Sequence, residues 1–421
     1  MDDYSMSYMD DRDTGGYSYV KVVGWLLLMT VGFGVAGLSA ISALTYLFVL
    51  ILGYYYLKTT KEWVIGHKWY VIYIICIGVS CIYSYMFNQQ NPISVFARSY
   101  SVIGFFSIFI FVHYGVYLRQ AEKAMVVISV LWCCCYLLQW MLYPNLIIWT
   151  GALDDVNIND GMFRMRLPGS VCGYCLFLYG INKWMTTHRT FYISYSLLGM
   201  LPIFIQGFRS LTAAIIICAF VMIGVISKKV WKTLLWFVVF CVLGLTATQV
   251  PIIGEKIEEM VERNDDDQTF ENEDYIRYFE YDYYANEFFV KPGEKFFGAG
   301  MPLLGKSDYG RKIMLAQERF GYYWVDLGLV GLSWIIGIPA VICLMIILYK
   351  NVRECRNDNI QYIRFTLIAI TLGSVVTSME LFREGNMVII GLMLYIVSVY
   401  RKEEQEKLDS GNMQELDLKS V

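Results

Sequence analysis

Five arginines stand where a membrane protein rarely places cations. Long apolar runs alternate with short connections, and these arginines lie at the ends of runs that carry few other basic residues: Arg98, Arg164, Arg166, Arg209 and Arg383. Guanidinium groups bind phosphate through paired hydrogen bonds that lysine cannot reproduce. Several arginines on one face would therefore make a site for an anionic ligand, whereas a single one can simply reach toward lipid headgroups.

Arg209 has the most unusual position of the five. It lies between two strongly apolar runs, in the stretch 205–211. An arginine at the centre of a membrane span costs about 2.5–3.5 kcal/mol on insertion scales, and less at a span boundary. We therefore expect Arg209 at the outer boundary of a span.

Carboxylates are the candidates for a general base. The three histidines map to cytoplasmic connections or to the interior of a span, so a reaction on the outer side must use a carboxylate or no base. The acidic residues near the outer ends of spans are Asp326, Glu318, Glu380 and Glu384. Asp326 leads directly into an apolar run, and burial raises the pKa of a carboxyl group, as a base requires. A salt bridge to an outer arginine or a helix-start cap is the alternative role for Asp326.

Composition identifies the kind of scaffold that must position these groups. The chain has 421 residues, of which 57% are hydrophobic and 17% charged, against about 25% charged in soluble proteins. This excludes a soluble enzyme and a disordered chain. The formal net charge of −3 offers no basic field for nucleic acid. The absence of Walker and GxGxxG motifs argues against nucleotide binding.

The hydropathy pattern predicts an all-α integral membrane protein with about 12 transmembrane helices and one large extracytoplasmic loop. The run 20–57 would be about 57 Å long as one helix, too long for a hydrocarbon core of about 30 Å, so it should form two spans. The other predicted spans are 68–87, 99–118, 122–143, 168–186, 190–207, 209–227, 232–250, 321–349, 360–379 and 384–400.

Basic residues give the predicted orientation. With the N-terminal segment 1–19 in the cytoplasm, every inside connection is short and basic, as the positive-inside rule requires. Helices 1–9 then occupy 20–250, helices 10–12 occupy 321–400, and the tail 401–421 is cytoplasmic. The segment 251–320 becomes the large outer loop, with amphipathic helices expected between Tyr275 and Phe289.

Other patterns give weaker signals. Cys172 and Cys175 form a CxxC inside an apolar segment, which favours small helix residues over a redox or metal role. The run 265–267 of three aspartates is better explained as a solvated loop than as a metal site. We therefore expect no metal and no cofactor.

The many tyrosines and tryptophans fit interfacial belts first, and the tyrosines near 275–284 suggest a sugar platform second.

Three passages, in order, resemble the bacterial O-antigen polymerase/ligase family of polytopic membrane proteins. The stretch 207–214 looks like the family's arginine step at the start of a span. The stretch 275–279, followed by 297–300, resembles its large-loop arginine helix and Gly-x-Gly turn. The stretch 324–332 looks like the acidic residue and Gly-Leu-x-Gly-Leu sequence that follow that loop. The resemblance covers roughly 205–350.

This resemblance implies a membrane glycosyltransferase of the bacterial inner membrane, working at its periplasmic face. It would polymerise undecaprenyl-diphosphate-linked repeat units into O-antigen of lipopolysaccharide, capsule or exopolysaccharide, without a metal. The implied catalytic residues are Arg209, Arg277, Asp326 and Glu318. The second set, for substrate binding, is Arg98, Arg164, Arg166, Arg319 and Arg383. The implied partners are lipid-linked oligosaccharides, the bilayer, a chain-length regulator and a flippase, with no nucleic acid.

The alternatives are a ligase of the same family, a lipid-linked oligosaccharide flippase or other transporter, and a non-catalytic scaffold. Ligases of the family carry a histidine shortly before the third passage, and the stretch 314–321 has none. A transporter predicts midplane charges and internal repeats, and the sequence has few such charges and no repeat. The polymerase is therefore the preferred reading.

Overall fold

The computed structural model describes residues 15–30, 39–59, 64–143, 145, 157–159, 162–164, 167–207, 209–228, 276–377, 379–383 and 385–419. Its α-helices in the first half are α1 Gly15–Thr30, α2 Ser39–Thr59, α3 His67–Asn88, α4 Pro92–Arg98, α5 Tyr100–Ile103, α6 Ile108–Tyr114, α7 Leu118–Met141, α8 Val171–Thr187, α9 Phe191–Gln206 and α10 Arg209–Ser227. A 3₁₀ helix, η2 Gly104–Ser107, joins α5 to α6, and a hairpin pairs β1 Asn157–Asn159 with β2 Met162–Arg164.

The second half is also helical. Its α-helices are α13 Ile276–Asp282, α14 Glu294–Phe297, α15 Asp308–Phe320, α16 Gly328–Ile336, α17 Ile338–Glu354, α18 Gln361–Val376, α19 Met379–Phe382 and α20 Asn386–Lys419. A π-helical turn, η5 Tyr283–Phe288, continues α13. Two 3₁₀ helices are η6 Trp324–Leu327, before α16, and η7 Asp358–Ile360, before α18.

The helices pack around α8 and the first half of α20. Helix α8 contacts α7, α9, α10 and α18, and its residues from 171 to 178 are all buried. The residues of α20 from 387 to 397 are buried as well. A helix that is apolar on every side needs neighbours on every side. These two segments therefore form the centre of the bundle.

The outer faces of several helices carry exposed apolar side chains, such as Leu44, Ile75, Leu197 and Ile217. Large apolar faces of this kind are unusual on a protein surrounded by water. Four helices in the described ranges are long and apolar enough to cross a bilayer, or up to six if each of two bent helix pairs counts as one span. The fold is therefore that of a helical membrane protein. The predicted span 232–250 lies outside the described residues.

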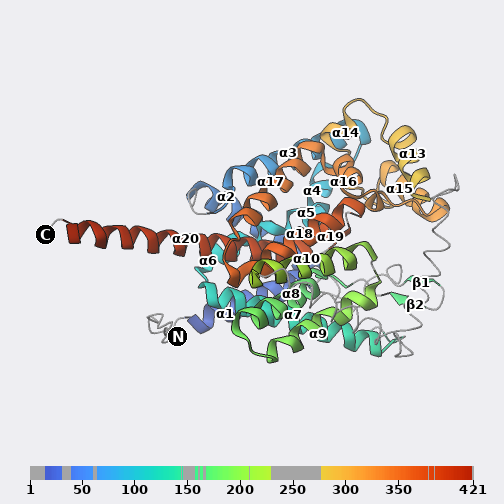
Figure 1. The fold of residues 1–421 in the computed structure, drawn as a ribbon. Helices are drawn as coiled ribbons and strands as arrows, with labels where there is room; N and C mark the ends of the chain where they lie inside the picture. Colours follow the sequence, from blue (N-terminus) through green and yellow to red (C-terminus); the bar gives the residue numbers. More distant parts are fainter. Residues whose placement is uncertain are drawn as a thin grey trace.

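The start of α1 and the projecting end of α20 lie at the same end of the bundle. Figure 1 shows the start of α1 and the long projection of α20 on the left, with α13–α15 and the β1–β2 hairpin on the right. Near the left end, Lys183 Nζ in α8 is 3.5 Å from Glu122 Oε1 in α7. Arg401 in α20 pairs with Glu354 in α17 at 3.8 Å. The basic ends of these four helices therefore share one surface.

One predicted span, 321–349, is broken in the structure, and a second bend lies at the start of the predicted span 99–118. The segment 324–354 bends by 117° between α16 and α17, and the segment 92–114 bends by 53° between α4 and α5. Gly337 makes the first break, with a φ of 95°, and Pro339 follows in the first turn of α17. Proline fits the first turn because no helical partner is needed there for its missing N–H. The prediction of one continuous helix over 321–349 is therefore wrong, because the segment forms two helices at a sharp angle.

The turn 298–300 docks onto this break. The N–H of Ala299 donates to the carbonyl of Trp334 at 2.8 Å, and the N–H of Gly300 donates to that of Ile335 at 2.9 Å. These bonds satisfy carbonyls that the end of α16 leaves without helical partners. The Gly-x-Gly turn at 298–300 is thus attached to the bent segment by backbone hydrogen bonds.

Candidate functional site

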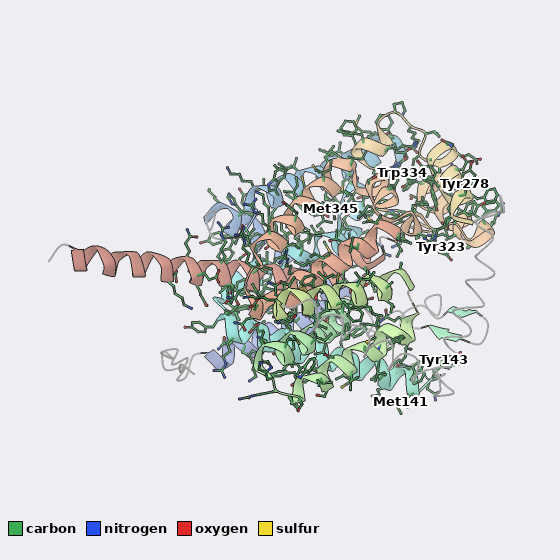
Figure 2. All side chains as sticks on the ribbon, in the orientation of Figure 1. Met141, Tyr143, Tyr278, Tyr323, Trp334 and Met345 are labelled. Atoms are coloured by element: carbon green, nitrogen blue, oxygen red, sulfur yellow. The ribbon has the colours of Figure 1, made fainter. Side chains whose placement is uncertain are left out.

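Polar groups gather at the end of the bundle that carries α13–α15. The 3₁₀ helix η6 packs against α13 on one side and against α18 and α19 on the other. Tyr278, Tyr323 and Trp334 mark this end in Figure 2. Two clusters flank η6, one around Glu280 of α13 and one around Glu380 of α19.

Glu280 is a buried carboxylate with one unsatisfied oxygen. Its side chain is 2% exposed. Oε1 accepts a hydrogen bond of 3.1 Å from the N–H of Tyr323, while Oε2 has no hydrogen-bond partner among the described residues. Burial without full pairing penalises the charged form of a carboxyl group. A reactive proton acceptor has this combination of exclusion from water and spare bonding capacity.

Burial, and then neighbouring groups, set the acidity of Glu280. Burial, and then the charge of Asp326, raise its pKa from 4.5 to about 7, while the Tyr323 N–H and the charge of Arg277 act in the opposite direction. A pKa near 7 places the group between its acid and base forms at physiological pH, where general acid–base catalysis is most efficient. Glu280 can therefore accept a proton and release it again.

Asp326 connects this cluster to the helical bundle. It lies in η6 and is half-buried. The hydroxyl of Thr377, at the end of α18, is 3.3 Å both from Asp326 Oδ1 and from the carbonyl of Val325. Arg277 is also half-buried, one helical turn before Glu280. Two carboxylates and one guanidinium therefore come together, from α13 and from η6.

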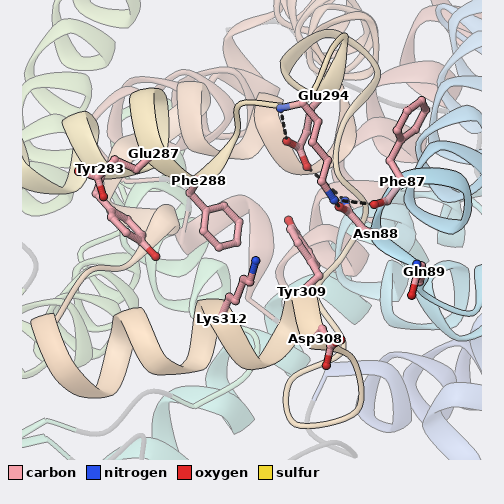
Figure 3. A pocket seen from close by; sticks show the side chains of 11 residues that line it. Phe87, Asn88, Gln89, Tyr283, Glu287, Phe288, Glu294, Asp308, Tyr309 and Lys312 are labelled. Atoms are coloured by element: carbon pink, nitrogen blue, oxygen red, sulfur yellow. Dashed lines mark hydrogen bonds between the residues drawn. The ribbon is translucent and has the colours of Figure 1, made fainter.

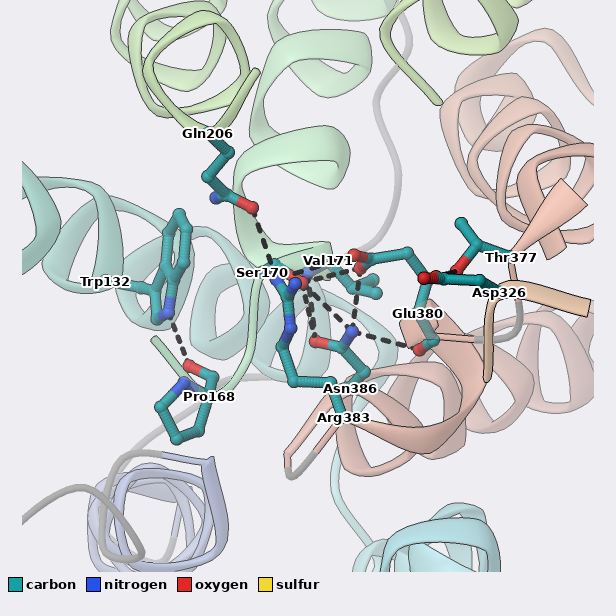
Figure 4. Close-up of polar contacts among 10 residues, drawn as sticks. All are labelled: Trp132, Pro168, Ser170, Val171, Gln206, Asp326, Thr377, Glu380, Arg383 and Asn386. Carbon is teal, nitrogen blue, oxygen red and sulfur yellow. Dashed lines mark hydrogen bonds and ion pairs between the residues drawn. The ribbon is translucent and has the colours of Figure 1, made fainter. Parts of the chain in front are cut away.

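The second cluster is a closed network around Glu380 (Figure 4). The hydroxyl of Ser170 donates to Oε2 at 2.6 Å, and Asn386 Nδ2 donates to the same oxygen at 2.9 Å. Arg383 Nη1 is 3.4 Å from Oε1 and 3.2 Å from Gln206 Oε1. Both oxygens of Glu380 are occupied. The network joins α8, α9, α19 and α20, and its geometry favours a positioning role for Glu380 and Arg383.

Arg98 and the backbones of Arg164 and Arg209 lie on three different elements. Arg98 ends α4, is exposed, and stands over the ring of Tyr100 at 5.8 Å. Arg209 begins α10, three residues after Gln206, so its backbone adjoins the Glu380 network. Arg164 pairs with Asn157 in the β-hairpin. The side chains of Arg164 and Arg209, and all of Arg166 and Glu384, lie outside the described residues.

Glu318 and Arg319 lie on the exposed surface of α15. Neither has an ion pair or a hydrogen bond that ties it to Glu280 or to Asp326 within the part of the chain that the structure describes. Of the residues predicted for catalysis, the structure brings Arg277 and Asp326 together and leaves Glu318 at the surface.

Sequence reasoning missed Glu280 as a candidate. It comes directly after the stretch 275–279 and three residues after Arg277, so both face the same side of a helix. That spacing is visible in the sequence. The burial of Glu280 is not visible there, because its hydrogen-bond donor, the N–H of Tyr323, lies 43 residues further along the chain.

Among the described residues, no three side chains of His, Cys, Asp or Glu lie close enough together to hold a metal ion. The groups available for electrostatic work at this end are the guanidinium of Arg277 and the carboxylates of Glu280 and Asp326. Comparison of the chain with protein-family models and with curated proteins finds no match.

Proposed function

We propose that this chain is a membrane glycosyltransferase that polymerises lipid-diphosphate-linked oligosaccharides on the outer face of a bacterial inner membrane. The proposal joins the resemblance of 205–350 to O-antigen polymerases with the charged cluster beside η6. The observation that carries it is the buried Glu280, with a pKa of about 7, beside Arg277 and Asp326. Its direction of growth, by transfer of the existing chain to a new unit, follows from the resemblance.

The chemistry needs a proton acceptor and a stabilised leaving group. A hydroxyl of the acceptor sugar attacks the anomeric carbon of the donor, the bond from that carbon to the diphosphate oxygen breaks, and the hydroxyl proton passes to the base. In this account Glu280 takes the proton. Asp326 raises the affinity of Glu280 for that proton, because two nearby negative charges repel each other.

The leaving lipid diphosphate carries away the electron pair of the broken bond. Its developing charge requires donors fixed in place before the reaction. Arg277 is the candidate on the loop and Arg209 the candidate at the start of α10. Guanidinium groups can form paired hydrogen bonds with phosphate oxygens. Arg383 is already neutralised by Glu380 and would hold the α9–α10 connection in place.

The proposal is tested by the banding of surface glycan in cells that lack the gene. These cells are complemented with wild type, Arg277→Ala, Arg209→Ala or Glu280→Gln, at matched membrane expression. Arg353→Ala is the matched control, because Arg353 is exposed at the opposite end of the bundle. We expect a ladder for wild type and the control, and single-repeat glycan for the deletion and the three site variants.

Other outcomes would support the alternatives. Repeat units that accumulate on the cytoplasmic side of the deletion strain would indicate a transporter. Long polymer that forms but stays on its lipid carrier would indicate a ligase. Full ladders in all three site variants would contradict an enzymatic site beside η6 and favour a scaffold.

A further inference from the structure

A pocket of about 580 Å³ opens between the outer loop and the end of α3, separate from the buried side chain of Glu280. Figure 3 shows Phe87, Asn88 and Gln89 on the α3 side, Tyr283 and Phe288 on the π-helical turn η5, and Lys312 rising from α15. The volume is within the range of small-molecule sites in proteins. The pocket therefore has room for a ligand larger than one sugar ring.

On one wall of the pocket the polar side chains already have hydrogen-bond partners. Glu294 accepts hydrogen bonds from Asn88 Nδ2 and from the N–H of Lys291, both at 3.2 Å. Lys291 Nζ donates to Asn88 Oδ1 and to the carbonyl of Phe87. Gln89 ends α3 in a left-handed conformation, with a φ of 52°, which is uncommon for a residue other than glycine. Strain of this kind is concentrated at functional sites.

The opposite wall offers unused polar groups. Tyr309 is 6% exposed, and its hydroxyl has no hydrogen-bond partner among the described residues. In Figure 3 this hydroxyl points toward the side of the pocket that carries Glu294 and Asn88. The ammonium of Lys312 points into the space between Phe288 and Tyr309. A buried hydroxyl without a partner costs free energy that a bound ligand can recover.

The lining excludes several classes of ligand. A lipid chain would strip water from Lys312 and Glu287 without replacing their hydrogen bonds. A phosphate group would meet the carboxylates of Glu287 and Asp308, while Lys291 already has two acceptors. For a cation, two of the three lining carboxylates are already engaged: Glu294 accepts two hydrogen bonds and Asp308 pairs with Arg311. The remaining class is a neutral polar molecule with apolar faces.

The geometry points to a saccharide-binding subsite in this pocket, occupied by sugars of a neutral oligosaccharide. A pyranose ring can lie against Phe288 and Tyr283, while its hydroxyl groups bond to Glu287, Lys312 and Tyr309. The π-helical turn supplies Tyr283, Glu287 and Phe288 together, and π-helical turns are frequent at functional sites. The role as an acceptor subsite rests on the proposed function, whereas saccharide binding itself does not.

The pocket adjoins the Glu280 cluster through aromatic contacts. The hydroxyl of Tyr284, next to Tyr283, donates to the carbonyl of Tyr322 at 3.0 Å, and Tyr323 is the residue that bonds Glu280. The ring of Tyr283 contacts that of Tyr322 at 5.6 Å. Tyr283 and the segment 322–323 therefore connect the pocket to the Glu280 cluster.

The test is saturation-transfer NMR on the full protein in lipid nanodiscs, with maltotriose and triacetylchitotriose as probes. The variants are Tyr309→Phe and Lys312→Ala, and the matched control is Lys306→Ala, an exposed lysine outside the pocket. We expect wild type and control to bind at least one trisaccharide. Each pocket variant should bind it about fivefold more weakly, as for loss of one hydrogen bond.

Tyr309→Phe separates binding from folding. The hydroxyl has no partner without a ligand, so its removal should leave the melting temperature unchanged or slightly raised. Absence of binding to both trisaccharides, equal binding by all variants, or displacement of the sugar by inorganic pyrophosphate would overturn the subsite. If wild type binds neither trisaccharide but its cells show a normal glycan ladder, only the subsite is contradicted. If wild type binds a trisaccharide but deletion of the gene leaves the glycan ladder unchanged, only the polymerase is contradicted.

Discussion

The N–H of Tyr323 donates a hydrogen bond of 3.1 Å to Oε1 of Glu280, and so ties α13 to the segment that leads into α16. This bond holds a carboxylate in a buried position beside Asp326. It leaves the second oxygen of Glu280 without a hydrogen-bond partner in the described ranges. In the proposed mechanism α13 therefore supplies the base, and Tyr323 fixes its position.

Activity should follow the ionisation of Glu280. Its pKa of about 7 means that the base form is lost as the pH falls below 7. We expect kcat/KM for chain growth to fall about tenfold per pH unit below that value. The measurement is a rate profile from pH 5 to 9 in detergent or nanodiscs. A profile that is flat between pH 5 and 7 in wild type would refute this role.

Stability should show the opposite dependence on pH. Burial raises the pKa of Glu280 from 4.5 to about 7, so the folded protein binds its proton more tightly than the unfolded chain does. The destabilisation is absent below pH 4.5 and complete above pH 7, where it is on the order of 3 kcal/mol. Glu280→Gln should therefore melt at a higher temperature than wild type at pH 8 and at nearly the same temperature at pH 4.5. Glu406→Gln, on exposed α20, is the control.

The Glu380 network should be sensitive to the loss of one charge. Arg383→Ala leaves Glu380 buried without its cation, and removing one partner of a buried pair costs about 3–5 kcal/mol. The double variant Arg383→Leu, Glu380→Gln leaves no charge of the pair behind and should recover most of that loss. Thermal unfolding in nanodiscs measures both. Equal destabilisation by the single and double variants would show that the ion pair is not the cause.

The docking of the Gly-x-Gly turn predicts a sharp difference between two glycines. A Cβ at Gly298 would lie 2.4 Å from the N of Gly337, while a Cβ at Gly305 would meet nothing within 4 Å. Both glycines have positive φ, so Gly305→Ala isolates the backbone strain of roughly 1–2 kcal/mol. Gly298→Ala should cost about 2–4 kcal/mol. Similar melting temperatures for the two variants would contradict this packing.

The helical class of the fold was predictable from sequence because apolar runs of span length have few other solutions. The two helices of 20–57 followed from length alone. The break at Gly337 was not predicted, since a glycine and a proline inside an apolar run do not by themselves reveal a 117° bend. At that bend the N–H groups of Ala299 and Gly300, more than 30 residues earlier in the chain, bond to the carbonyls of Trp334 and Ile335.

The candidate site was predictable only in part. Arg277 was a candidate only through the resemblance of 275–279, and the structure brings it together with Asp326 at Glu280. Asp326 stood out as a charge beside an apolar run. Arg383 stood out for the same reason, yet it is paired with Glu380, which the sequence separates from it by only three residues. Charge type and position are visible in sequence, whereas the identity of the partner across helices is set by packing.

The most direct test is chain growth by the purified protein in nanodiscs, supplied only with its undecaprenyl-diphosphate-linked repeat unit. We predict that wild type releases undecaprenyl diphosphate and lengthens the glycan in equal steps. Glu280→Gln and Arg277→Ala should each fold, as judged by melting temperature, and lose at least 100-fold in rate, which is about the lower end of the contribution of a general base. Chain growth at the wild-type rate in both variants, or none in wild type, would contradict the account.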